Sequence, residues 1–101
     1  MNKIKILSTL GLTMKAGLLI SGEDMVLDAI RKSRARLVFL ASDTGPTTIK
    51  RISDKTTFYQ VPLISSLSSD ELSRAIGKAN RKVIAVIDTQ LALLLQRTAN
   101  E

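Results

Sequence analysis

The residues best suited to chemistry in this chain lie in the segment SGED, where Ser21 and Gly22 precede Glu23 and Asp24. The apolar spacing that follows predicts a helix beginning near Glu23, which puts Gly22 at its N-terminus. The first N–H groups of a helix have no partner within the helix and attract phosphate. Carboxylates can accept hydrogen bonds from guanine N–H groups. These four residues therefore predict a contact with nucleic acid.

The same segment has a purely structural interpretation. Glu23 and Asp24 fall in the first turn of the expected helix, whereas Arg31 and Lys32 fall in its last turn. The helix dipole favours this arrangement for stability alone. The sequence leaves both interpretations open.

The densest basic cluster follows this helix and consists of Arg31, Lys32, Arg34 and Arg36. These residues could flank an RNA duplex, or they could form a solvated turn. Lys15 adjoins the expected binding face and is a further candidate for phosphate contact. Alternatively, Lys15 stabilises the C-terminus of the first helix.

A second group of cations surrounds Gly77 and consists of Arg74, Lys78, Arg81 and Lys82. We expect most of them to be surface charges, with one or two near the RNA. The polar loop before this group supplies Ser65, Ser66 and Leu67 as further candidates for RNA contact. Leu67 could touch a splayed base or anchor the loop in the core.

Composition narrows the classes of function. The 101 residues carry 15 Lys and Arg against 9 Asp and Glu, a net charge of +6, which is a bias toward nucleic acid. With no Cys and no His, zinc sites, disulfides and Cys–His or Ser–His catalytic pairs are excluded, and no cofactor is expected. Aromatic residues make up only 3% of the chain, so single-strand binding on aromatic platforms is not expected.

The hydrophobic pattern predicts five helices alternating with four strands. The uninterrupted apolar run after Arg36 is typical of a strand covered on both faces. We therefore predict one domain over residues 1–101, an α/β fold with a three-layer α/β/α sandwich and a four-stranded mixed sheet. The expected elements are a helix over Asn2–Met14, a strand over Leu18–Ile20, a helix over Glu23–Lys32, a strand over Arg36–Ala41, a helix opened by Pro46, a strand over Val61–Ile64, a helix from Ser68 to Gly77, a strand over Lys82–Ile87 and a last helix capped by Asp88.

Four segments together resemble the L-seven-Ae family of ribosomal proteins, and most of all its short bacterial, YlxQ-like branch. They are TMKAGLLISGED, AIRKSRARLVFLASD, YQVPLI and LSRAIGKANRKVIAVID. The resemblance implies an α/β/α sandwich that binds kink-turns, which are sharply bent RNA duplexes with tandem sheared G·A pairs. It also implies that the contacts come from Ser21–Asp28 and from Ser65–Asp70.

The chain departs from the kink-turn signature of that family, which runs from a glycine through a polar amide and an acid to a lysine. Gly22 keeps the glycine, but Asp24 stands at the amide position, Met25 at the acid position and Asp28 at the lysine position. An aspartate would repel the phosphate that a lysine attracts.

The leading hypothesis from the sequence is a non-catalytic, cytoplasmic RNA-binding protein of the ribosomal-protein type, part of a ribonucleoprotein. Its expected partner is a kink-turn-like RNA, with ribosomal RNA and the ribosome as candidates. We expect a monomer with no membrane contact. The alternative is a protein-interaction module on the same fold that has lost kink-turn recognition, for which Met25 and Asp28 are the best evidence. An enzyme would need a carboxylate or lysine in a concave pocket with a shifted pKa.

Overall fold

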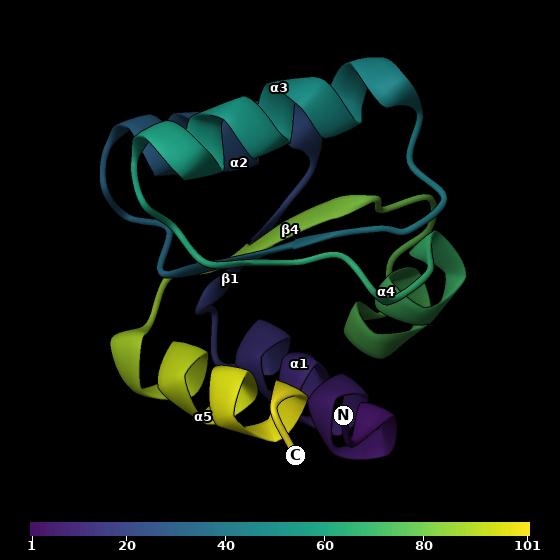
Figure 1. Cartoon of the computed structure of the whole chain (residues 1–101). Helices are drawn as coiled ribbons and strands as arrows, with labels where there is room; N and C mark the ends of the chain where they lie inside the picture. Colours follow the sequence, from purple (N-terminus) through teal and green to yellow (C-terminus); the bar gives the residue numbers. More distant parts are fainter.

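The computed structural model describes all residues from Met1 to Glu101 and contains five helices and four strands (Figure 1). Helices and strands alternate along the chain, as the sequence predicts. The elements are α1 (Lys3–Lys15), β1 (Leu19–Ser21), α2 (Glu23–Arg31), β2 (Leu37–Leu40), α3 (Pro46–Phe58), β3 (Leu63–Ile64), α4 (Ser69–Ile76), β4 (Val83–Val86) and α5 (Thr89–Ala99). None of the helices is both long and apolar enough to cross a lipid bilayer.

The four strands form one mixed sheet in the order β1-β4-β2-β3. Strand β4 is antiparallel to both of its neighbours, with Val86 opposite Leu19 on one side and Leu37 on the other. Strands β2 and β3 are parallel, with Val38 opposite Leu63. Strands β1, β2 and β3 therefore all run in the same direction.

Because of this common direction, the strand ends form two distinct sides of the sheet, which we call edges although they are not the outermost strands. We call the edge where β1, β2 and β3 end, and where β4 begins, the Gly22 edge. We call the opposite edge, where β2 and β3 begin and β4 ends, the Arg36 edge. Helices α2 and α3 each start at the Gly22 edge and return the chain to the Arg36 edge, because each connects strands that run the same way.

Helices cover both faces of the sheet and make two separate cores. Helices α2 and α3 lie over one face, and α1, α4 and α5 lie over the other (Figure 1). Phe39, Leu37 and Ile84 point toward the α1, α4 and α5 side, whereas Val38 and Ala85 point toward α2 and α3. All residues of β2 and β4 are buried, which confirms the predicted three-layer α/β/α sandwich with strands covered on both faces.

The expected helix caps are present. The Ser68 hydroxyl accepts a hydrogen bond from the Glu71 N–H, and the Glu71 carboxylate accepts one from the Ser68 N–H, so these two residues form a capping box at the predicted start of the helix. Gly77 ends α4 with a φ of 70°. Asp88 caps α5 by accepting from the Leu91 N–H at 2.9 Å.

The apolar spacing of the first helix predicts an inward stripe of Ile4, Leu7, Leu10 and Met14, which the structure confirms except at Ile4. Leu10 is buried and Leu7 and Met14 pack against the core, whereas Ile4 is 80% exposed. Helix α1 packs against both α4 and α5, and Ile4 lies outside these contacts. The residues buried on this face are Ile6, Leu10 and Thr13. A polar residue can lie there because the Thr13 hydroxyl donates to the Thr9 carbonyl at 2.7 Å.

Candidate nucleic-acid interface

Helix α2 begins directly at the end of β1, and Gly22 makes the turn between them. Gly22 has φ 102° and ψ 144°, a conformation that is strained for any residue with a Cβ atom. Its N–H donates to the Val83 carbonyl at 2.9 Å, and its carbonyl accepts from the Val26 N–H at 3.0 Å. The start of α2 is therefore fixed to the first residue of β4.

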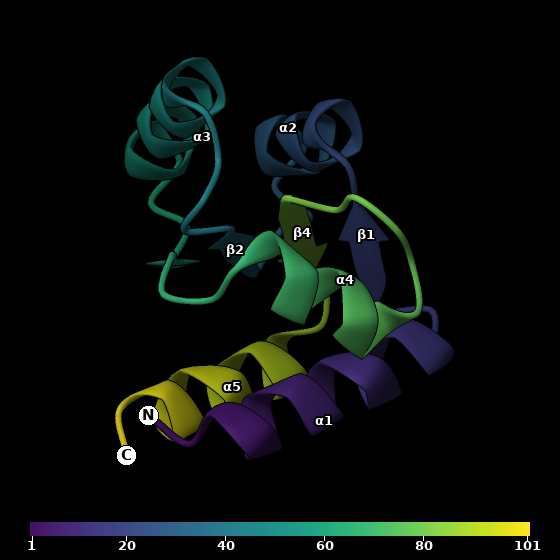
Figure 2. The ribbon, with the colours of Figure 1, turned by 90° about the vertical axis from the view of Figure 1, so that its right-hand side faces the viewer.

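The loop between α4 and β4 faces this helix start. Figure 2 shows the loop passing beside the end of β1 on its way to β4. A depression of about 200 Å³ lies between the loop and α2, and it is lined by Gly22, Glu23, Thr48, Asn80, Arg81 and Lys82. A terminal nitrogen of Arg81 lies 3.5 Å from the position that a Cβ atom at Gly22 would take. Two basic side chains thus border the N-terminus of α2.

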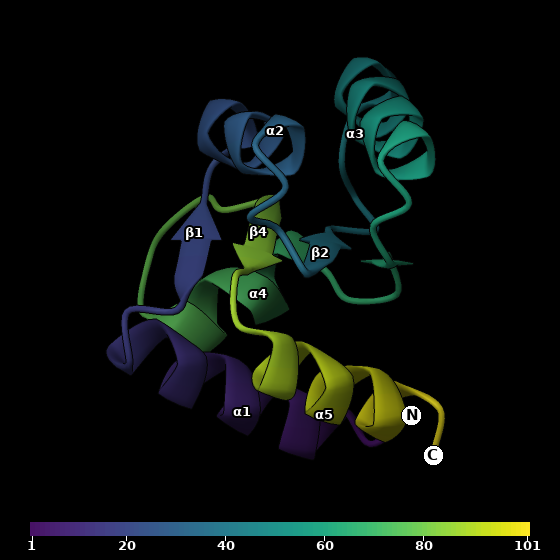
Figure 3. The same ribbon diagram turned by 90° about the vertical axis from the view of Figure 1, so that its left-hand side faces the viewer.

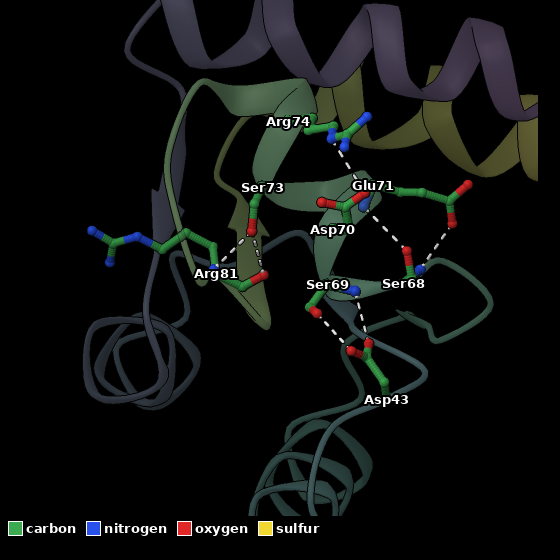
Figure 4. Close-up of polar contacts among 8 residues, drawn as sticks. All are labelled: Asp43, Ser68, Ser69, Asp70, Glu71, Ser73, Arg74 and Arg81. Atoms are coloured by element: carbon green, nitrogen blue, oxygen red, sulfur yellow. Dashed lines mark hydrogen bonds and ion pairs between the residues drawn. The ribbon is translucent and has the colours of Figure 1, made fainter.

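Ser73 of α4 holds the backbone of this loop in place. Its hydroxyl accepts a hydrogen bond from the Arg81 N–H at 2.8 Å and lies 3.3 Å from the Arg81 carbonyl oxygen (Figure 4). The side-chain Nε of Arg81 is buried and has no hydrogen-bond partner within the protein. The backbone is therefore well anchored, whereas the terminal nitrogens of the guanidinium make no hydrogen bond or ion pair within the protein and keep their donors available for another molecule.

The acids at the start of α2 differ in their surroundings. The Glu23 carboxylate accepts a hydrogen bond from the Thr48 hydroxyl at 2.7 Å and forms an ion pair with Arg51. These contacts join α2 to α3 and offset the Glu23 charge. Asp24 is exposed and makes no ion pair, so its carboxylate is free to accept a hydrogen bond from a ligand.

Two more departures from the kink-turn signature follow Asp24, Met25 in the first turn of α2 and Asp28 in the second. Met25 is 62% exposed. Asp28 is half-buried and forms an ion pair with Lys32, four residues on, at 3.1 Å. The charge of Asp28 is therefore partly offset within its own helix.

The loop that precedes α4 also lies at the Gly22 edge, because it follows β3. Ser65 and Ser66 are exposed there. Leu67 is only 1% exposed and belongs to the core beneath α4, and its carbonyl accepts from the Ser42 N–H at 2.8 Å. The prediction that Leu67 contacts RNA is therefore wrong, because its side chain is buried. The anchoring alternative describes it, because the chain turns its one large apolar residue inward at this point.

Two carboxylates stabilise the start of α4. Asp43 accepts hydrogen bonds from the Ser69 hydroxyl at 2.6 Å and from the Ser69 N–H at 2.8 Å (Figure 4). These bonds, the hydroxyl first, lower the pKa of Asp43 below its ordinary value of 3.8. The hydrogen bond from the Ser68 N–H, followed by the contact with Lys3, lowers the pKa of Glu71 below its ordinary value of 4.5.

None of the basic residues chosen from the sequence lies at the Gly22 edge. Arg31, Lys32 and Arg34 follow the end of α2 and lie at the Arg36 edge, away from Gly22. Lys15 ends α1, four residues before β1 begins, and lies beside the end of α4. Only the serines of the β3–α4 loop share the Gly22 edge with Ser21–Asp24.

The sequence places Arg81 and Lys82 in a group of four cations of which one or two are expected near the RNA, but it does not single them out. They lie beside Gly22 because β4 pairs with β1, with Ser21 opposite Ile84. The hydrophobic pattern identifies each strand but carries little information on which strands are neighbours. The one signal in the sequence that could have pointed to this site is that Arg81 and Lys82 directly precede the buried strand β4.

The chain is similar to characterised families over most of its length. The sequence model of the Ribosomal protein L7Ae/L30e/S12e/Gadd45 family matches residues 4–93. A protein called RNA-binding protein YlxQ from Enterococcus faecium is 38% identical over 91 residues, which are 90% of this chain and 87% of that protein. RNA-binding protein YlxQ from Bacillus subtilis (strain 168) is 43% identical over 83 residues, 82% of this chain and 83% of that protein.

Solved structures share the same fold. A protein of unknown function from Bacillus halodurans C superimposes with a TM-score of 0.92 at 39% identity, covering 96% of this chain and 98% of that one. The Giardia lamblia 15.5kD RNA binding protein superimposes with a TM-score of 0.83 at 16% identity, covering 96% of this chain and 86% of that one. At so low an identity the second likeness shows the fold alone.

Proposed function

The chain belongs to the Ribosomal protein L7Ae/L30e/S12e/Gadd45 family and to its YlxQ-like bacterial branch, and from that membership we propose that it is a non-catalytic, cytoplasmic RNA-binding protein. Its RNA would be a bent, kink-turn-like element, for which ribosomal RNA is the first candidate. The protein would act as a single-domain monomer that recognises the shape of the RNA.

One observation carries this proposal: the start of α2 at Gly22 borders a surface depression that the guanidinium of Arg81 also lines. The first N–H groups of the helix could bind one phosphate, and the free donors of Arg81 could bind a neighbouring phosphate or a guanine edge. In a regular RNA duplex the major groove is too narrow for a helix. A sharp bend opens that groove, which favours a kinked RNA as the ligand.

We assign the residues of this surface according to their exposure. Ser21, Gly22 and Asp24 would contact the RNA directly, and Glu23 would hold α2 against α3 through Arg51. Ser65 and Ser66 could donate hydrogen bonds from the neighbouring loop. Arg81 and Lys82 join this set, and they would supply the positive charge that the helix itself lacks at Asp28.

Met25 and Asp28 favour a second candidate function, a protein-interaction module on the same fold. An exposed methionine is suited to an adaptable apolar contact. An aspartate in the second turn of α2 weakens phosphate binding there. The two functions make opposite predictions for RNA affinity.

The test is a gel-shift titration with two RNAs, a kink-turn and the same RNA with its sheared G·A pairs replaced by Watson–Crick pairs. We expect binding to the kink-turn only, with an affinity that falls steeply as salt increases. Arg81→Ala should weaken this binding, whereas Arg97→Ala, an exposed arginine on α5 without an ion pair, should leave it unchanged. Equal affinity for the two RNAs would exclude kink-turn recognition, and no binding to either would favour the protein-interaction module.

A further inference from the structure

We propose that the Arg36 edge carries a second RNA site, which binds a single-stranded segment by stacking an unpaired base on Phe58 and Tyr59. This site lies at the opposite end of α2 and α3 from Gly22. It goes beyond the proposed function, because it requires neither a kink-turn nor any residue of the Gly22 edge.

The topology of the sheet brings the parts of this site together. Helices α2 and α3 both end at the Arg36 edge, and the two loops that follow them lie side by side (Figure 3). A depression of about 250 Å³ lies between these loops, lined by residues of both: Ile30, Ser33, Arg36, Tyr59, Gln60 and Pro62. Ser33 and Gln60 each take a φ near 58° as the second residue beyond their helix. The chain thus turns sharply on either side of the depression.

The low aromatic content of the chain argues against single-strand binding on aromatic platforms, yet the two aromatic residues outside the core lie together here. Of its three aromatic side chains, Phe39 is in the core, Phe58 is 77% exposed and Tyr59 is 37% exposed. The rings of Phe58 and Tyr59 meet edge to face, with centroids 4.9 Å apart and planes at 74°. A ring held in this way by its neighbour keeps a face open to solvent, and an open ring face is a platform for a nucleobase.

The charges around the aromatic pair are positive. Four cations at this edge take part in no ion pair within 4.0 Å: Arg31, Arg34, Arg36 and Lys55. The nearby acids are already engaged, because Asp28 pairs with Lys32 and Asp54 pairs with Lys50. Asp88 follows β4 at the same edge and uses its carboxylate to cap α5.

The helix dipole accounts for only some of these cations. A positive side chain in the last turn stabilises a helix, which explains Arg31 on α2 and Lys55 on α3. Arg34 and Arg36 lie beyond the end of α2 and are exposed, so helix stability does not require them. Their side chains can therefore bind phosphates without disturbing the fold.

The combination favours single-stranded RNA over a duplex. In a duplex the faces of the bases are covered by their neighbours, so a duplex could contact the arginines but would leave Phe58 exposed. An unpaired nucleotide can place its base on the ring and its phosphate on an adjacent arginine. Tyr59 and Arg36 line the same depression, and Phe58 contacts Tyr59.

The chain contains a natural probe for the test, because Tyr59 is its only tyrosine and there is no tryptophan. The experiment is a titration of the full chain with an unstructured RNA dodecamer of mixed sequence, followed by tyrosine fluorescence and by the anisotropy of labelled RNA. We expect saturable quenching of Tyr59. Phe58→Ala should weaken binding by about five-fold or more, the range expected for the loss of one stacked base.

Matched variants make the result decisive. Ile49→Ala removes an exposed apolar side chain from the opposite end of α3, and Arg97→Ala removes an unpaired arginine from α5. Neither should change the affinity, whereas Arg34→Ala with Arg36→Ala should lower both the affinity and its salt dependence. Arg81→Ala should retain the Tyr59 quenching even where it loses kink-turn binding, so failure of one site is distinguishable from failure of the other.

Three results would overturn this second site. They are no quenching of Tyr59 at any RNA concentration, equal affinities for Phe58→Ala and Ile49→Ala, and equal quenching by the dodecamer and by its fully paired duplex. Quenching by an acidic peptide without quenching by RNA would assign the surface to a protein partner and would also overturn it.

Discussion

The hydroxyl of Ser73 lies 2.8 Å from the backbone nitrogen of Arg81 and accepts its N–H. Through this bond α4 determines where the loop before β4 runs, and hence where the Arg81 side chain meets the start of α2. Ser73 is only 7% exposed and is not itself proposed to contact RNA. It thus acts indirectly, by positioning the charged side chain of Arg81.

Replacing Ser73 with alanine tests this relationship. Ser73→Ala leaves the Arg81 N–H without its partner at a buried position, and we expect the free energy of unfolding to fall by about 1–2 kcal/mol. Urea unfolding measures the change. Ser8→Ala, an exposed serine of α1, is the control and should have almost no effect. Equal stability of the two variants would show that the bond contributes nothing.

Gly22→Ala should destabilise the protein through its backbone. With φ 102°, an alanine would be strained by about 1–3 kcal/mol, although the nearest side-chain atom leaves room for a methyl group. Gly45→Ala is the matched control, because Gly45 has an ordinary φ of −67° and also begins a helix. Thermal unfolding compares the two, and a larger loss for Gly45→Ala would contradict this explanation.

Asp28→Lys should increase affinity for a kink-turn RNA by about ten-fold or more, because a repulsive charge becomes attractive. Asp54→Lys is its matched control. Both aspartates form an ion pair with a lysine four residues away at 3.1 Å, but Asp54 lies on α3. The measurement is a titration of labelled RNA. The same gain in both variants would indicate a general charge effect and not a specific phosphate contact.

Acid should weaken the start of α4. The pKa values of Asp43 and Glu71 are lowered in the folded protein, so their contributions are fully present above the ordinary values of 3.8 and 4.5. Their contributions to the free energy of unfolding decrease once the pH falls below these ordinary values, and they are lost when the pH has also passed the lowered pKa of the folded protein. We expect Asp43→Asn and Glu71→Gln to be less stable than the parent at neutral pH, with the difference shrinking toward about pH 3. Urea unfolding at several pH values tests this, and a constant difference would argue against it.

Leu67→Ala should reduce the free energy of unfolding by about 2–5 kcal/mol, as expected when a fully buried leucine is truncated. Leu93→Ala, at a position that is 50% exposed, should cost far less. Chemical unfolding measures both variants. A small effect at Leu67, together with a loss of RNA affinity, would instead favour direct contact with a base.

Local patterns predicted the elements of this fold well, because caps and apolar runs act over a few residues. Ser68 with Glu71, Gly77 and Asp88 each mark the helix boundary that the structure contains. The exposure of Ile4 could not be predicted, because it depends on how α1 packs against α4 and α5. The neighbours of Gly22 could not be predicted for a similar reason, since Arg81 reaches it only through the pairing of β1 with β4.

Strand order has a consequence for how the chain reaches its native state. Strand β4 lies between β1 and β2 although it is the last of the four to be synthesised. A ribosome-bound chain that ends before Val83 therefore lacks the central strand of its sheet. Without β4, strand β1 has no strand to pair with, and β2 lacks its antiparallel neighbour. Closing such distant pairings slows folding and exposes strand edges in the meantime. We expect the nascent protein to remain protease-sensitive until β4 has left the exit tunnel.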